Sequence, residues 1–81
     1  MVELYVTSTC PFCIKVIKAA EAMGLEEGSD YLIIDAAHGT PGRKKVVDTG
    51  GKGMVPFLMD GERWMYESDD IIDYLRDTYA S

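Results

Sequence analysis

The order of apolar segments in the first part of the chain restricts the folds open to it. Residues 2–6 alternate between apolar and polar side chains, as in a strand, and residues 31–34 form a continuous apolar run, which predicts a strand covered on both faces. Between them, residues 11–23 carry apolar side chains at helical spacing, and Gly24 ends that pattern. A strand–helix–strand unit crosses over with a right-handed sense and makes its two strands parallel. We therefore expect a β-α-β unit at the start of the fold.

A second helix is predicted after the second strand. Thr40 followed by Pro41 is typical of a helix start, because threonine caps the free N–H groups and proline needs no hydrogen bond in the first turn. The helix is expected to run to about Asp48, before a segment rich in glycine.

A hairpin and a last helix complete the pattern. Residues 57–59 and 63–66 flank the dipeptide Asp60-Gly61, which favours a tight turn between antiparallel strands. Ser68 is expected to cap a helix with an apolar face made by Ile71, Ile72, Leu75 and Tyr79. The predicted order is β-α-β-α-β-β-α, an α/β fold with one mixed four-stranded sheet flanked by three helices.

Length and charge narrow the class of protein. The 81 residues are expected to form a single domain, residues 1–81, that folds as a monomer by packing alone. No apolar run approaches the about 20 residues needed to span a bilayer, and Glu3 interrupts the apolar start, so we expect no membrane contact, no signal peptide and a cytoplasmic location. The formal net charge of −6 argues against a nucleic-acid partner.

The chain has two cysteines, and both lie in the segment Cys10-Pro11-Phe12-Cys13, directly before and within the first predicted helix. The helix N-terminus favours a thiolate through its partial positive charge and free N–H groups. Cys10 stands before the helix and is the candidate nucleophile. Cys13 lies one turn further on the buried stripe and suits a resolving role. This pattern predicts thiol–disulfide exchange.

Two structural roles for the cysteine pair, a zinc site and a stabilising disulfide, fit the sequence less well than thiol–disulfide exchange. A zinc site normally needs four ligands, and besides the cysteines the chain offers only His38 as a soft ligand, so no metal is expected. A structural disulfide would close a very small loop and would constrain little of the unfolded chain.

Three segments in order resemble a glutaredoxin of the dithiol type, and the resemblance covers essentially the whole chain. Residues 10–13 resemble its Cys-Pro-Tyr-Cys site, residues 54–56 resemble its Thr-Val-Pro segment, and residues 67–70 fall where glutaredoxins hold the γ-glutamyl end of glutathione. The fold implied is thioredoxin-like. There are two departures: Thr7 stands where the family usually has lysine, and Glu67-Ser68 is similar to the Glu-Ser pair of glutathione transferase N-terminal domains.

The resemblance implies a set of glutathione-binding residues. Pro56 is expected to follow a cis peptide bond, which would turn the Val55 backbone towards the cysteines and let glutathione pair with it. Ser68 and Asp69 would hold the carboxylate and the ammonium of the γ-glutamyl group, although both also suit a helix start. Phe12 would offer an exposed contact surface. One of Lys15, Arg43 and Lys44 could meet the glycine carboxylate in place of the lysine missing at Thr7.

The function implied is a glutathione-dependent thiol–disulfide oxidoreductase, in which glutathione is the co-substrate and the partners are disulfide-bonded or glutathionylated proteins. Two alternatives stay open. The first is a module that binds an iron–sulfur cluster through its first cysteine and glutathione. The second is a thioredoxin-like reductant recharged by a flavoprotein reductase.

Overall fold

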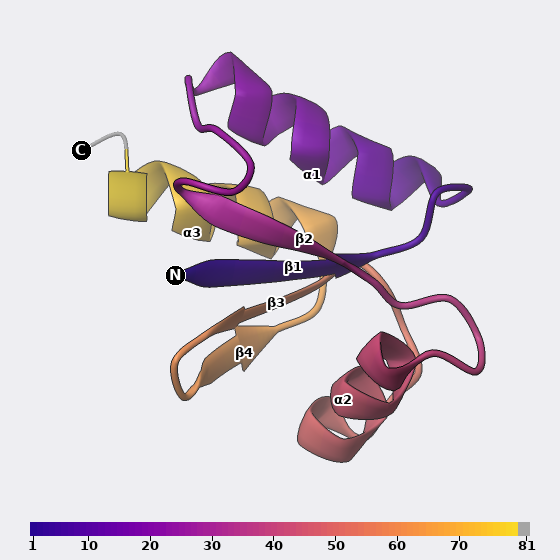
Figure 1. The fold of residues 1–81 in the computed structure, drawn as a ribbon. Coiled ribbons are helices and arrows are strands. Elements are labelled where there is room, and N and C mark those ends of the chain that lie inside the picture. The colour runs from indigo at the N-terminus through magenta and orange to yellow at the C-terminus, as the bar shows by residue number, and fades with distance from the viewer. Residues whose placement is uncertain (80–81) are drawn as a thin grey trace.

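In the computed structural model, which describes residues 1–79, the predicted strands form one mixed sheet (Figure 1). The order across the sheet is β2 (Tyr31–Asp35), β1 (Val2–Val6), β3 (Phe57–Asp60) and β4 (Arg63–Met65). β1 pairs parallel with β2 and antiparallel with β3, and β3 pairs antiparallel with β4. The predicted β-α-β unit and the hairpin are therefore both present.

Three helices flank this sheet: α1 (Pro11–Ala22), α2 (Pro41–Gly50) and α3 (Ser68–Tyr79). α1 and α3 lie together over one face, and α2 lies on the other side (Figure 1). The predicted α/β fold with a four-stranded mixed sheet and three helices is confirmed.

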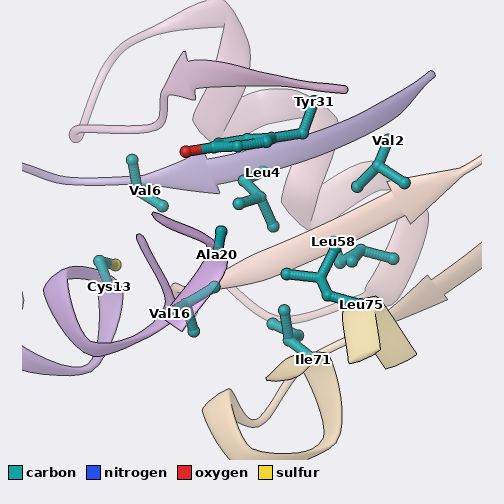
Figure 2. Packing of buried hydrophobic residues seen from close by; sticks show 10 residues of the cluster. All are labelled: Val2, Leu4, Val6, Cys13, Val16, Ala20, Tyr31, Leu58, Ile71 and Leu75. Carbon is teal, nitrogen blue, oxygen red and sulfur yellow. The ribbon is translucent and has the colours of Figure 1, made fainter. Parts of the chain in front are cut away.

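The main core lies between the sheet and the pair formed by α1 and α3 (Figure 2). It contains Val2, Leu4, Val6, Cys13, Val16, Ala20, Tyr31, Leu58, Ile71 and Leu75. Because Cys13 belongs to the buried stripe of α1, its thiol is part of this apolar core and is closed to solvent.

A smaller core on the other face consists of Tyr5, Ala36, Val46 and Phe57. Gly42 allows α2 to approach the end of β2, because a Cβ at this position would lie 2.0 Å from the carbonyl oxygen of Asp35. The close approach explains why the second residue of α2 is a glycine.

The expectation that the second strand is covered on both faces was wrong. β2 is an edge strand, and Leu32 and Ile33, which point to opposite faces, are 37% and 39% exposed. The continuous apolar run therefore did not indicate a strand buried on both faces, because within residues 1–79 β2 is the edge of the sheet and the helices leave part of both of its faces exposed.

Two element boundaries also differ from the expectation. α2 continues to Gly50 and ends where Gly51 adopts the left-handed conformation, with φ of 86°. In the hairpin, Asp60 pairs with Arg63, so the two loop residues are Gly61 and Glu62 and the turn lies one residue later than predicted. Within residues 1–79, no helix combines the length and the apolar character that crossing a membrane would require.

Candidate functional site

Cys10 occupies the capping position of α1. Its Sγ accepts a hydrogen bond from the backbone N–H of Cys13 at 3.3 Å, and its thiol points to the carbonyl oxygen of Val55 at 3.9 Å. Pro11 begins the helix and has no N–H to satisfy. Cys10 is half-buried, so its sulfur lies at the positive end of α1 and is still reachable from solvent.

Cys13 has the opposite environment. Its side chain is fully buried, and burial raises the pKa of the Cys13 thiol to about 12. Hydrogen bonds from Thr7 act against this shift, and the neighbouring Cys10 adds to it. Both cysteines are free thiols in the structure. At neutral pH Cys13 is therefore a protonated thiol, and Cys10 is the accessible member of the pair.

The loop between α2 and β3 carries the Val55–Pro56 peptide bond, which is cis as predicted. Arg43 holds this loop from one side: its guanidinium donates to the carbonyl oxygens of Ala36 and Gly53. These bonds set the backbone just before the segment that faces Cys10.

Tyr66 holds the same loop from the other side. Its hydroxyl accepts from the backbone N–H of Lys52 at 3.1 Å and donates to the carbonyl oxygen of Lys52 at 2.7 Å. A Cβ on Gly50 would lie 2.2 Å from this hydroxyl, so the glycine leaves the space that the tyrosine needs. Tyr66 and Arg43 together place Val55 beside the cysteine.

A pocket of about 260 Å³ opens next to this loop. It is lined by Phe12, Lys15, Met54, Val55, Pro56, Tyr66, Glu67, Ser68 and Asp69. The five residues named from the sequence as glutathione contacts, Phe12, Val55, Pro56, Ser68 and Asp69, are thus brought together. Cys10 is not itself a lining residue, and its sulfur reaches the pocket at the Val55 carbonyl.

Four lining residues were not singled out as site residues from the sequence: Lys15, Met54, Tyr66 and Glu67. Lys15 was expected to be mainly solvated, yet its Nζ lies 2.5 Å from Oδ1 of Asp69 on α3. Only the packing of α1 against α3 makes these two residues neighbours, so helical periodicity could not reveal the pair. Met54 and Glu67 flank predicted site residues, and that adjacency was the available signal.

The start of α3 differs in detail from the prediction. Ser68 is the first residue of the helix and not its cap. Glu67 takes the preceding position with φ of 63°, and its carbonyl oxygen accepts from the N–H of Ile71 at 3.0 Å. Asp69 and Asp70 lie in the first turn, where the helix dipole favours carboxylates. The N–H groups of Ser68, Asp69 and Asp70 come before the first hydrogen bond of the helix and so have no acceptor within it.

The other candidates lie apart from this pocket. Lys44 pairs with Asp48 on α2, and His38 is exposed in the loop before α2. No group of three His, Cys, Asp or Glu side chains within residues 1–79 is placed to hold a metal ion.

The fold and the placement of Cys10 at the start of α1 define a thioredoxin-like domain. The family model described as "Glutathione S-transferase, N-terminal domain" matches residues 4–81. The chain therefore belongs to the family of glutathione S-transferase N-terminal domains. Comparison with curated protein sequences found no significant match.

Solved glutathione transferases contain a domain of the same fold. Glutathione transferase Omega 3C from Trametes versicolor superposes with a TM-score of 0.82 at 21% identity, over 99% of this chain and 34% of its own. A trimeric glutathione transferase from Leishmania superposes with a TM-score of 0.78 at 30% identity, over 98% of this chain and 17% of its own. A delta-class glutathione transferase from Nilaparvata lugens superposes with a TM-score of 0.75 at 26% identity, over 98% of this chain and 36% of its own. The chain spans about a third or less of the length of these proteins.

Proposed function

We propose that this protein is a glutathione-dependent thiol–disulfide oxidoreductase of the dithiol glutaredoxin type, with residues 1–81 acting as one domain. The observation that carries the proposal is the asymmetry of the cysteine pair. Cys10 is accessible at the positive end of α1, and Cys13 is buried with its pKa raised to about 12. An attacking thiol must be accessible, so Cys10 suits the nucleophile and Cys13 is left for the resolving step.

In the first step, the Cys10 thiolate attacks a sulfur of the substrate disulfide. A bond forms between Cys10 and that sulfur, the substrate S–S bond breaks, and the other sulfur leaves as a thiolate. The backbone N–H of Cys13, 3.3 Å from the Cys10 sulfur, stabilises the attacking thiolate. With a glutathionylated protein, attack on the glutathione sulfur leaves glutathione on Cys10, and a second glutathione then takes it away as glutathione disulfide.

With a protein disulfide, Cys13 completes the reaction. Its sulfur attacks Cys10 in the mixed disulfide, a Cys10–Cys13 bond forms, and the substrate leaves as a dithiol after accepting the Cys13 proton. Once Cys10 carries a disulfide it is no longer an anion, so the part of the raised Cys13 pKa that comes from Cys10 disappears. Two glutathione molecules then restore the dithiol and leave as glutathione disulfide.

The pocket beside Cys10 is the proposed glutathione site. The Val55 backbone would pair with the extended peptide, Phe12 would contact it, and Pro56 would shape the loop. Ser68 and Asp69 would bind the γ-glutamyl group at the start of α3. Membership of a glutathione S-transferase family supports this choice of ligand. A cytoplasmic location, a monomeric state and disulfide-bonded or glutathionylated protein partners are parts of the same proposal.

Family membership also supports a second candidate, transfer of glutathione to an electrophilic carbon. In that reaction the glutathione sulfur itself is the nucleophile, and Cys10 would only hold it near the start of α1. Two cysteines would then not be required for turnover.

One pair of assays separates the two functions. Reduction of bis(hydroxyethyl) disulfide by glutathione tests the oxidoreductase, and conjugation of chlorodinitrobenzene tests the transferase. We expect the first activity to be high and to vanish in Cys10→Ser, with little conjugation. Efficient conjugation that survives in Cys10→Ser, without disulfide reduction, would favour the transferase.

A further inference from the structure

We propose that Lys15 binds the α-carboxylate of the γ-glutamyl group, and that the ion pair between Lys15 and Asp69 opens to admit this amino-acid head between its two charges. The inference rests on the proposed function, because it takes glutathione as the ligand of the pocket. It adds a cation to this group's proposed contacts, which otherwise come from Ser68 and Asp69 on α3.

The first step of the argument is the position of the pair. Lys15 comes from α1 and Asp69 from α3, both line the pocket, and Nζ and Oδ1 lie 2.5 Å apart. Their side chains are 49% and 80% exposed, and ion pairs this exposed contribute little to stability. The pair can therefore open at small cost when a ligand offers each charge another partner.

The second step is the charge of the pocket. Its lining has two carboxylates, Glu67 and Asp69, and among the described lining residues Lys15 is the only cation. A ligand with more carboxylates than ammonium groups meets an excess of negative charge there. If Lys15 stayed paired with Asp69, no cation among the described lining residues would face the ligand. Binding of an anionic ligand therefore favours a conformation in which the Lys15 ammonium pairs with a ligand carboxylate.

The third step is the chemistry of the ligand head. The γ-glutamyl group carries an ammonium and a carboxylate on one carbon atom. When the ammonium moves to Asp69, Lys15 loses its partner, and the carboxylate on the same carbon is the nearest replacement. Charges then alternate from Lys15 through the ligand to Asp69, and the first N–H groups of α3 add donors to the carboxylate.

The fourth step excludes the other cations considered for the ligand. The guanidinium of Arg43 bonds the carbonyl oxygens of Ala36 and Gly53, and Lys44 pairs with Asp48 on the outer side of α2. Lys15 lies at the Asp69 end of the pocket, which is the γ-glutamyl end. The structure therefore points to the γ-glutamyl carboxylate as its partner and not to the glycine carboxylate that the sequence suggested.

Three probes test the assignment by calorimetric titration. The first is S-methylglutathione, whose sulfur cannot react. The second is its analogue without the α-carboxylate of the γ-glutamyl group, and the third is its glycine amide, which lacks the other carboxylate. The variants are Lys15→Met, Lys15→Arg and the control Lys18→Met, which removes an exposed lysine of the same helix outside the pocket.

We expect Lys15→Met to weaken binding of S-methylglutathione and of the glycine amide by about tenfold each, the loss of one charge-assisted contact. The analogue without the α-carboxylate should bind Lys15→Met and the unmodified protein equally. Lys15→Arg should restore most of the affinity, and Lys18→Met should change nothing.

Two results would overturn the inference alone: unchanged affinity of Lys15→Met for S-methylglutathione, or a loss that the glycine amide does not share. The second result would assign Lys15 to the glycine carboxylate. Failure of the unmodified protein to bind S-methylglutathione is a different outcome, since it would remove the proposed function and the inference together.

Discussion

The Sγ of Cys10 and the backbone N–H of Cys13 are joined by a hydrogen bond of 3.3 Å, so the proposed resolving residue donates directly to the proposed nucleophile. The bond requires the first turn of α1, because only a helical turn brings the N–H of the third following residue to the capping side chain. The same turn places the Cys13 side chain in the main core. One local structure thus creates two thiols with different exposure.

Replacing either cysteine should therefore cause a different loss of activity. Cys10→Ser should abolish thiol transfer, because the remaining sulfur is buried. Cys13→Ser keeps the backbone N–H and should retain reduction of small glutathione mixed disulfides while losing most reduction of protein disulfides. Coupled assays with each substrate measure this, and the reverse pattern would exchange the two roles.

Asp69→Ala should raise the Michaelis constant for glutathione by about tenfold, because the ligand ammonium loses a charge-assisted hydrogen bond. Turnover at saturating glutathione should change little, since Asp69 lies at the end of the pocket away from Cys10. Asp70→Ala is the matched control: Asp70 is exposed in the same first turn but does not line the pocket. If both variants lost only a little thermal stability and kept normal kinetics, Asp69 would act solely on the helix dipole.

Tyr66→Phe should loosen the loop before β3, because the backbone of Lys52 loses both hydrogen bonds to the hydroxyl. We expect the Michaelis constant for glutathione to rise more than turnover falls, and the free energy of unfolding to drop by about 1 kcal/mol. Urea denaturation and steady-state kinetics measure the two effects. Tyr74→Phe removes a hydroxyl that bonds Asp60, outside the pocket, and should leave the kinetics unchanged.

Stability should fall when the pH rises above 9. Burial raises the pKa of Cys13 from 9.0 to about 12, and burial together with Glu3 raises the pKa of Tyr5 from 10.0 to about 12. Because both groups keep their protons longer in the folded protein, the unfolded chain deprotonates first. Their contribution is complete below pH 9 and is lost as the pH rises towards 12.

Denaturation by urea under reducing conditions, repeated at increasing pH, measures this loss, with a slope of at most about 1.4 kcal/mol per pH unit for each group. In Cys13→Ala the decline should begin later, near the ordinary pKa of tyrosine, 10.0. A constant free energy of unfolding across this range would contradict the assigned environments of both groups.

Gly42→Ala should destabilise the fold by about 2 kcal/mol or more, because the new methyl group would overlap the backbone carbonyl of Asp35, which cannot rotate away. The start of α2 would have to move from the end of β2, and Arg43 with it. Lys45→Ala, an exposed change on the same helix, should have almost no effect. Thermal unfolding compares them, and equal melting temperatures would show that α2 can shift freely.

Much of the fold could be predicted from the sequence, because helix starts, turns and apolar stripes are each specified by a few neighbouring residues. Thr40 and Pro41 mark a helix start through the geometry of a single turn, and Thr40 does accept from the N–H of Arg43. Val2, Leu4 and Val6 of β1 and the apolar stripe of α1 face the main core, whereas Tyr5 is buried in the smaller core on the other face. The errors lie where a local pattern fits two outcomes: the apolar run of β2 suits an edge strand as well as a covered one, and Asp60-Gly61 allows two turn registers one residue apart.

By itself, the sequence determined the order of strands and helices, the cysteine pair at a helix start and the place of Cys13 on an apolar stripe, because each is encoded within a few neighbouring residues. The five residues that come to lie at one pocket were implied by the resemblance to glutaredoxins. Only the tertiary structure decided that Lys15 meets Asp69, 54 positions later, and that Arg43 and Tyr66 hold one loop from two sides. These contacts depend on how helices pack on a sheet and against each other. Packing distances of a few ångströms are set by the whole chain and leave no periodic trace in any one segment.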